Sequence, residues 1–413
     1  MKRKNDGMKR PLAAILSVVL ILAAATFIPA AETSAYAEGS DQPGRSPLAS
    51  VKADEGSLHI AAKSAVLMDA STGTVLYEQN AYEELPPASV TKVMTMLLAL
   101  EAVERGQFSL EDRVTISERA ASMGGSQMYM EPGETHTVEE LFQGASICSA
   151  NDACVALAEL TRGTEEMFVE SMNARAKELG MEHTHFVNTN GLPVDDHYSC
   201  AHDIAVMSKE LLRHPKTREW FTTWQTTITV GLPGKEKEFG LTNTNKLIKT
   251  YQGANGVKTG FTQDAGYCLS ASATRGNLTL VAVVLGAESS KVRFTEASRL
   301  LDYGFATYDS VRLAERGQVV GNLPVEKGSP RTVNAVTKEE VSVLIPKGQG
   351  ESISSKPIWK EGLKAPVAAG DVIGELKLYR EEKEIGSYPL YAEAAVERAG
   401  IPELCMRLIR TLF

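Results

Sequence analysis

A serine and a lysine stand three residues apart where an apolar run begins, in PPASVTKVMTMLLALE at residues 86–101. In a helix, residues i and i+3 share a face, so the Lys92 amine can reach the Ser89 hydroxyl. An amine that accepts the hydroxyl proton makes that oxygen a nucleophile for acyl transfer. The alternative is an ordinary helix start after two prolines with a solvated lysine, because Ser-x-x-Lys alone is short and common. The rest of the chain must decide between these interpretations.

A second motif, Ser-Ala-Asn at residues 149–151, lies at a break between two helical patterns. The Ser149 hydroxyl can relay a proton between Lys92 and a leaving amine. The Asn151 carboxamide can donate to a substrate carbonyl and accept from the lysine. Both groups are what an acyl-transfer site needs beside its nucleophile and base.

A third motif, Lys-Thr-Gly, lies in the strand-like stretch VKTGFT at residues 257–262. The positive charge of Lys258 would hold Lys92 neutral by like-charge repulsion, and the Thr259 hydroxyl could bind a carboxylate. Gly260 has no side chain where a substrate backbone must approach the edge of the sheet. The three motifs together therefore predict an acyl-transfer site.

In this order, SVTK, SAN and KTG resemble the active-site signature of the penicillin-binding and serine β-lactamase superfamily. Longer stretches are similar to the low-molecular-mass D-alanyl-D-alanine carboxypeptidases, in particular the sporulation-associated type of endospore-forming bacteria. These stretches are ASMGGSQMYMEPGE, FVNTNGLPVDDHYSCAHDIAVMSKELL and NTNKLIKTYQGANGVKTGFTQDAGYCLSASA. The resemblance runs from about residue 60 to the C-terminus.

The resemblance implies that Ser89 attacks the penultimate D-alanine carbonyl of a peptidoglycan stem pentapeptide, that D-alanine leaves, and that water hydrolyses the acyl-enzyme. Backbone N–H groups of Ser89 and Phe261 would form the oxyanion hole. Arg293 matches a family arginine that holds the terminal carboxylate; the alternative is a solvated helix residue. β-Lactam antibiotics would be covalent inhibitors, and neither a cofactor nor a metal is expected. The chain has Ala150 where glycine is commoner, and Phe261 where some relatives have histidine.

Three other functions are alternatives for this sequence. A serine β-lactamase would add a water-activating glutamate; residues 170–173 resemble that element, but Glu170 and Asn173 are three residues apart rather than four. A catalytically inactive wall-binding protein would act through its C-terminal domain, although its three motifs are intact. A zinc peptidase would have to bind its metal through residues outside a His-Glu-x-x-His motif, because the sequence contains none. The candidate ligands would be His183, His185, His197, His202 and Asp203.

The first 37 residues have the composition of a signal peptide. MKRKNDGMKR is basic, PLAAILSVVLILAAATFIPAA is apolar, and AYA at residues 35–37 offers a cleavage site. The alternative is an uncleaved membrane anchor, because the apolar stretch approaches spanning length. Either segment predicts export to the extracytoplasmic side. Cleavage would change the formal net charge from −9 to −12, which disfavours nucleic-acid binding.

The order of the remaining patterns predicts an α/β (α+β) protein of several parts. A flexible leader at 38–60 precedes a catalytic domain at 61–307, in which strands, helices, strands and a helix follow one another. That order predicts an antiparallel sheet flanked by helices, with a helical insertion. Short alternating runs at 308–390 predict a small all-β domain. Five cysteines without Cys-x-x-Cys indicate neither a complete disulfide framework nor a zinc site, and we expect small buried residues at 148, 154, 200, 268 and 405.

The C-terminal segment, residues 391–413, ends in AGIPELCMRLIRTLF. Pro402 suits the first turn of a helix. At about 100° per residue, the apolar side chains of that helix occupy an arc of about 200°, with the arginines on the other side. The helix is too short to span a membrane, so we expect it to lie on an anionic membrane surface. Its apolar residues are Leu404, Cys405, Met406, Leu408, Ile409, Leu412 and Phe413.

Overall fold

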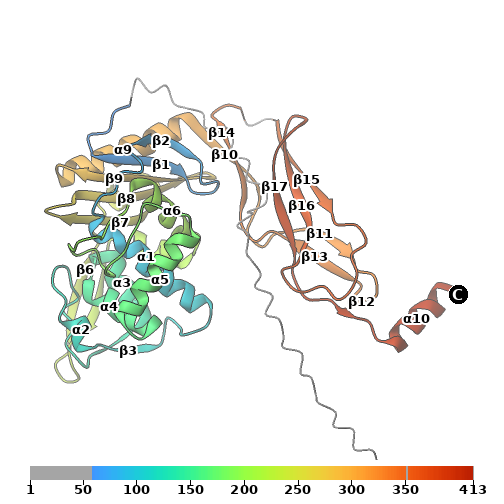
Figure 1. The fold of residues 1–413 in the computed structure, drawn as a ribbon, viewed down its shortest axis with the longest axis horizontal. Helices are drawn as coiled ribbons and strands as arrows, with labels where there is room; N and C mark the ends of the chain where they lie inside the picture. Colours follow the sequence, from blue (N-terminus) through green and yellow to red (C-terminus); the bar gives the residue numbers. More distant parts are fainter. Residues whose placement is uncertain (1–57, 350–351, 413) are drawn as a thin grey trace, which may run out of the picture. The chain divides into compact units, whose positions relative to one another are not determined.

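The computed structural model describes residues 58–349 and 352–412. The predicted signal peptide and most of the predicted leader lie outside the described residues. Figure 1 shows the helices and strands by label.

A five-stranded antiparallel sheet organises the first part of the described chain. Its strand order is β2-β1-β9-β8-β7. The apolar runs on either side of Asp-Ala-Ser-Thr-Gly, residues 69–73, form the antiparallel hairpin of β1 and β2. Within residues 58–349 and 352–412, β7 pairs with β8 alone, so its other edge is open to further hydrogen bonding. The strands are β1 (Ser64–Asp69), β2 (Val75–Gln79), β7 (Ala254–Thr262), β8 (Gly266–Arg275) and β9 (Leu278–Ala287).

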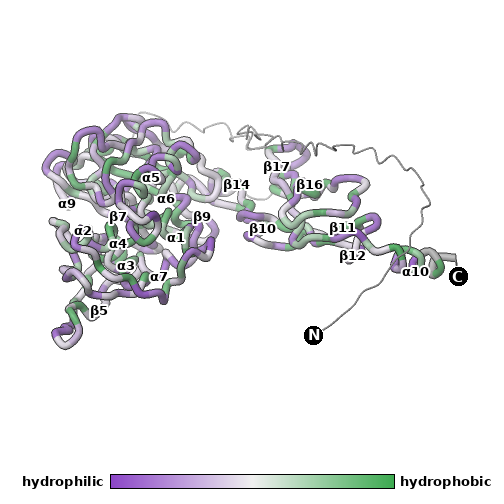
Figure 2. Tube along the Cα trace, turned by 60° about the horizontal axis from the view of Figure 1, so that its bottom comes forward, coloured by the Kyte–Doolittle hydropathy of each residue, from purple (hydrophilic) through white to green (hydrophobic). Residues whose placement is uncertain are grey.

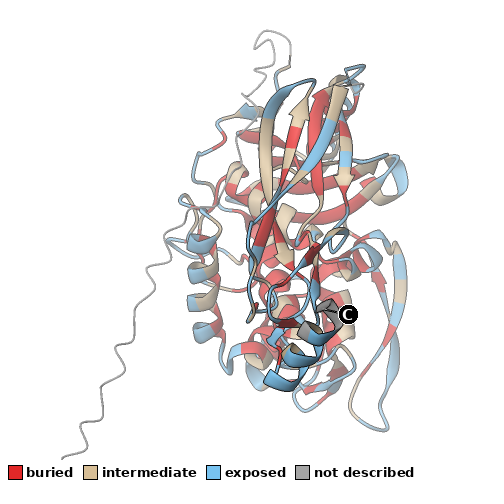
Figure 3. Ribbon diagram, turned by 90° about the vertical axis from the view of Figure 1, so that its right-hand side faces the viewer, coloured by how far each residue is buried: buried red, intermediate tan, exposed pale blue. Residues whose placement is uncertain are grey.

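Apolar side chains cover both faces of this sheet. Helix α9 (Ser290–Thr307) packs against one face, where Leu67, Leu280 and Leu300 are fully buried. Alternate residues of the same strands, such as Val66 and Val281, join the larger core under the helical part. Figure 3 shows the buried residues in red along the strands and helices. The α/β fold with a sheet flanked by helices is therefore confirmed.

The helical part lies between β2 and β7 in the sequence and includes two short strands. Helix α1 is buried on nearly all sides, because its apolar residues face several other helices and the sheet. The elements are η1 (Ala88–Thr91), α1 (Lys92–Glu104), β3 (Arg113–Thr115), α2 (Glu118–Ala121), β4 (Thr135–Thr137), α3 (Val138–Gln143), η2 (Gly144–Cys148), α4 (Asn151–Arg162), α5 (Glu165–Glu178), α6 (Ala201–Leu212) and α7 (Lys216–Thr222). A hairpin of β5 (Gln225–Val230) and β6 (Lys237–Thr242) and the short helix α8 (Leu247–Thr250) follow.

The second part of the chain is built from β-strands around a core of its own, which includes Leu323, Ile373 and Leu390. Figure 2 shows hydrophobic residues in green along its strands. The all-β character predicted for residues 308–390 is confirmed. The strands are β10 (Tyr308–Ala314), β11 (Val319–Pro324), β12 (Gly328–Ser329), β13 (Thr332–Val336), β14 (Val341–Pro346), β15 (Ile353–Trp359), β16 (Val372–Arg380), β17 (Lys383–Ala392) and β18 (Glu397–Arg398).

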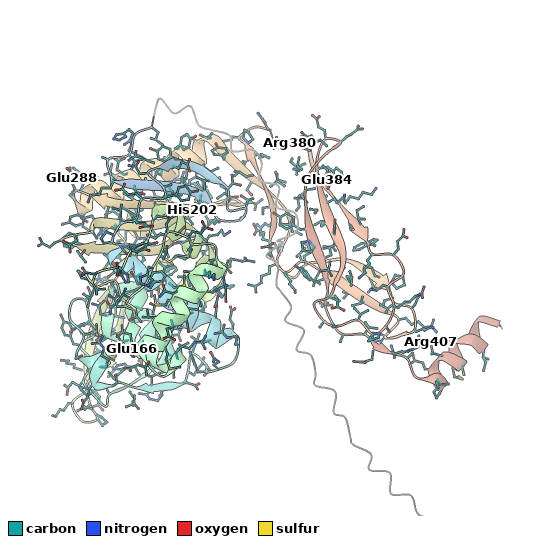
Figure 4. The ribbon with its side chains drawn as sticks, viewed as in Figure 1. Glu166, His202, Glu288, Arg380, Glu384 and Arg407 are labelled. Atoms are coloured by element: carbon teal, nitrogen blue, oxygen red, sulfur yellow. The ribbon has the colours of Figure 1, made fainter. Side chains whose placement is uncertain are left out.

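The chain ends in helix α10 (Ile401–Leu412), with Pro402 in its first turn. The predicted C-terminal segment starts at residue 391, but the helix itself begins at Ile401. The end of β17 and the short strand β18 lie between these two positions. Ile401, Met406 and Ile409 are each more than half exposed. Arg407, labelled in Figure 4, pairs with Glu403 one turn earlier. Among the described residues, no helix has both the length and the apolar character to cross a membrane.

Candidate active site

Ser89 lies in η1, and Lys92 is the first residue of α1. The Lys92 Nζ donates a hydrogen bond of 2.8 Å to the Ser89 Oγ. Lys92 is fully buried, whereas Ser89 is partly exposed. The spacing of one helical turn therefore produces the predicted contact, and the solvated lysine of the alternative interpretation is wrong.

Burial is the main cause of the unusual acidity of Lys92. It lowers the pKa of the amine from 10.5 to about 8 because the interior disfavours the charged form. The prediction that the charge of Lys258 keeps Lys92 neutral is corrected here, because burial is the largest cause of the lowered Lys92 pKa. The pKa of the buried Lys258 amine is itself lowered, first by burial and next by the charge of Lys92.

A second hydrogen bond fixes the lysine. The Lys92 Nζ also donates to the backbone oxygen of Asn190, at 2.7 Å. Asn190 lies in a loop before α6, and its side-chain Oδ1 accepts from the Leu192 N–H. This role of Asn190 cannot be predicted from the sequence, because every residue has a backbone carbonyl and the residue type gives no signal.

The backbone before Ser89 is closely packed. Ala88 has φ +48, a conformation that costs a non-glycine residue of order 1 kcal/mol. Gly191, with φ +84, lies against it: a Cβ on Gly191 would be 1.8 Å from the Ala88 oxygen. The loop at 191 therefore needs glycine and holds the turn that carries Ser89.

The Ser-Ala-Asn motif joins η2 to α4. Ser149 has φ +66, while Ala150 has φ −61, so the residue that replaces glycine is not in the left-handed region. The Asn151 amide donates to the Gly124 oxygen at 2.6 Å, and its Oδ1 is buried without a partner among the described residues. Both elements that flank the motif, η2 and α4, contact α1, the helix that begins at Lys92. The structure thus brings the second motif beside the first.

The Lys-Thr-Gly motif lies on the edge strand β7, next to η1. Lys258 is almost fully buried, and its amine donates to the backbone oxygen of Thr259. The Thr259 hydroxyl donates to the Thr244 hydroxyl. A Cβ on Gly260 would lie 2.8 Å from the Pro87 oxygen and 3.1 Å from the Ser89 nitrogen. Only glycine allows this approach, which places the strand edge directly beside the serine.

Arg293 and Phe261 flank this strand. Arg293, on α9, is 8% exposed, so the solvated alternative is wrong. Its Nη1 donates to the backbone oxygens of Gly260 and Cys268, at 2.7 and 3.2 Å, which ties the helix to β7 and β8. Phe261 is half exposed and packs on Tyr267. Carboxylate binding by Arg293 stays a prediction.

The residues of the rival functions lie apart from this cluster. Glu170 is exposed on α5. Among the histidines, the His197 Nδ1 accepts from the Val187 N–H and its Nε2 contacts the Thr91 hydroxyl, while His202, labelled in Figure 4 on α6, pairs with Asp203. None of these groups touches Ser89 or Lys92 among the contacts of the described chain.

The five cysteines are unpaired. Cys154, Cys200 and Cys268 are buried and Cys148 is partly so, as expected, but Cys405 is exposed on α10. Burial raises the pKa of Cys148 to about 11 and that of Cys154 to about 12, so both remain thiols at neutral pH. Packing is therefore their role beside the serine.

Two protein families match the chain. Residues 49–289 match the D-alanyl-D-alanine carboxypeptidase family, peptidase S11, and residues 308–398 match the C-terminal domain of penicillin-binding protein 5. The D-alanyl-D-alanine carboxypeptidase DacF of Bacillus subtilis (strain 168) is 44% identical over 340 residues, covering 82% of this chain and 87% of that protein. The D-alanyl-D-alanine carboxypeptidase DacC of Escherichia coli (strain K12) is 36% identical over 352 residues, covering 82% of this chain and 85% of that protein.

Solved structures show the same fold. Penicillin-binding protein 5 from Haemophilus influenzae superimposes with a TM-score of 0.64 at 31% identity, over 83% of this chain and 99% of that one. Penicillin-binding protein 6B from Escherichia coli superimposes with a TM-score of 0.61 at 31% identity, over 81% of this chain and 96% of that one. With the motifs, the family matches and these relatives in agreement, the chain belongs to the D-alanyl-D-alanine carboxypeptidases of peptidase family S11.

Proposed function

We propose that this D-alanyl-D-alanine carboxypeptidase acts on peptidoglycan stem pentapeptides through an acyl-enzyme on Ser89. The observation that carries the proposal is the 2.8 Å hydrogen bond from a buried amine with a lowered pKa to a partly exposed hydroxyl. Neutral Lys92 takes the Ser89 proton as the oxygen attacks the penultimate D-alanine carbonyl. The C–N bond then breaks, and D-alanine leaves.

The other motif residues supply the remaining steps. Backbone N–H groups of Ser89 and Phe261 stabilise the oxyanion, each worth about 3 kcal/mol. Ser149 passes the proton from Lys92 to the leaving amine, and Asn151 orients the acyl amide. Lys258, Thr259 and Arg293 provide the hydroxyl and positive charge for the terminal carboxylate.

The direct test of the activity uses purified peptidoglycan and the mature chain. Loss of pentapeptides and an equal amount of free D-alanine are expected. Pentapeptide loss without free D-alanine would indicate a different peptidase. The similarity to Bacillus subtilis DacF and the resemblance to the sporulation-associated type support a role in wall or spore-cortex crosslinking.

β-Lactams should acylate the same serine, and the adduct should persist for minutes or longer. The reason is that, in the described part of the chain, no glutamate lies among the contacts of Ser89 and Lys92 to activate a deacylating water, Glu170 being exposed on α5. Stopped-flow acylation and the decay of the adduct mass measure the two steps separately. Steady turnover of penicillin at tens per second would instead place the enzyme with the β-lactamases.

We further propose that α10 attaches the exported enzyme to the outer face of the cell membrane. The support is the exposure of Ile401, Met406 and Ile409 on a helix that also carries arginines, as the green and purple residues of Figure 2 illustrate. Burial of its apolar residues could contribute about 5 to 10 kcal/mol, reduced by the cost of ordering the helix. That balance suits reversible, peripheral attachment. The alternative is packing of this face on the β domain.

Deleting residues 400–413 should release the enzyme from anionic liposomes without altering penicillin binding. The variant carrying Ile401→Glu, Met406→Glu and Ile409→Glu should do the same, since it removes only the exposed apolar surface. Sedimentation with anionic and neutral vesicles measures attachment. Equal sedimentation of the full-length and truncated enzymes would exclude the anchor.

A further inference from the structure

A cavity of about 330 Å³ lies beside the residues that lead into Ser89. Three segments line it: residues 86–88, the loop at 191–197, and the turn at 262–264 that follows β7. The motif residues Lys92, Ser149 and Lys258 do not line it. The mechanism proposed above therefore leaves this cavity without a role.

The cavity continues the substrate path along the open edge of β7. Gly260 touches η1 beside Ser89, and Thr262, two positions later, faces the same side of the strand. Thr259 and Thr262 are about 10 Å apart at about 3.3 Å per residue. Consider a peptide that runs antiparallel to β7 with its C-terminal carboxylate near Thr259. The residue before its acylated D-alanine would then lie at the cavity.

The charged groups that line the cavity are negative. Asp195 and Asp264 contribute carboxylates from opposite segments, and both side chains are exposed. Neither carboxylate has an ion-pair partner within the described parts of the chain. His197 is neutral, because burial lowers its pKa to about 4 and both ring nitrogens are engaged. No lysine or arginine lines the cavity.

We propose that this cavity is a subsite for a cationic side chain on the acyl-donor peptide, at the residue that precedes the acylated D-alanine; this rests on the function proposed above. The occupant is the free ammonium group of a diamino acid, which two carboxylates at a shaped cavity complement in charge. Acylation of that amine, as in a crosslinked stem, removes its positive charge. The enzyme therefore prefers donor peptides whose diamino acid is not crosslinked.

The test compares two tripeptides, Nα-acetyl-L-lysyl-D-alanyl-D-alanine and its Nα,Nε-diacetyl form. The wild-type enzyme should release D-alanine from the free-amine peptide with a kcat/KM about ten times higher, and added salt should reduce the difference. In an Asp195→Asn/Asp264→Asn variant, kcat/KM for the free-amine peptide should fall to kcat/KM for the diacetyl peptide. For the diacetyl peptide, kcat/KM should stay within about twofold of its wild-type value.

Asp196→Asn is the matched control, because it removes the same charge from the same loop but does not line the cavity. Its backbone has φ +63, which asparagine accepts. The control should keep the tenfold preference. An equal preference in wild type and double variant, or an equal loss in the control, would overturn the subsite while leaving the proposed function intact. Absence of D-alanine release from both peptides would overturn the proposed function and the subsite with it.

Discussion

The Ser89→Ala enzyme should release D-alanine at least about 10⁴ times more slowly than wild type and should form no penicillin adduct. The reason is that Ser89 carries the partly exposed hydroxyl to which the buried Lys92 amine is hydrogen-bonded. In the proposed mechanism this oxygen forms the acyl bond, and no binding contact can replace it. Intact-mass spectrometry after penicillin treatment and a D-alanine assay measure the two losses.

A suitable control is Ser171→Ala on α5, whose hydroxyl donates to the backbone oxygen of Met167 in its own helix. This variant should be labelled and active like wild type. Matching thermal unfolding of both variants would show that the fold is retained. Labelled Ser89→Ala protein would refute the assignment of the nucleophile.

Replacing Lys92 by methionine should slow acylation by at least about 10³-fold. Methionine has a similar length and is apolar, so it fills the same buried volume without the base. Residues that act as one unit lose function non-additively, so the Ser89→Ala/Lys92→Met double variant should be no slower than Ser89→Ala alone. Near wild-type acylation by Lys92→Met would exclude the lysine as the base.

The same residue sets the expected pH dependence. With a pKa of about 8, about a tenth of the Lys92 amine is neutral at pH 7, compared with less than about one part in a thousand at a pKa of 10.5. In the proposed mechanism the neutral form is the base, so the wild-type acylation rate should rise with pH and level off above about 8. The residual rate of Lys92→Met should lack this rise. Stopped-flow measurements with penicillin between pH 6 and about 10 follow both.

Local spacing accounts for what the sequence predicts well. Ser89 and Lys92 meet because one helical turn joins them, and the alternation of β1 and β9 gives the two-sided sheet. Pro402 begins α10 for an equally local reason, since proline suits a first helical turn. Such features depend on a few neighbouring residues, which the sequence displays directly.

Contacts between distant segments account for the rest. The Asn190 oxygen reaches Lys92 across 98 positions of sequence, and Gly191 packs on Ala88 from the same loop. Burial, the main cause of the low Lys92 pKa, is a property of the assembled core, so the sequence suggested the nearby charge of Lys258 instead. Arg293 shows the same limit: its helix was predictable, but its contact with the Gly260 oxygen depends on how α9 lies on the sheet.

Peptide mapping of the penicillin-treated enzyme identifies the nucleophile. The protein is digested, and tandem mass spectrometry locates the penicilloyl group. One adduct is expected, on the hydroxyl of Ser89, which the Ser89→Ala variant lacks. An adduct on Ser149 or on Cys148, or an unmodified Ser89 in a protein that still releases D-alanine, would contradict this expectation.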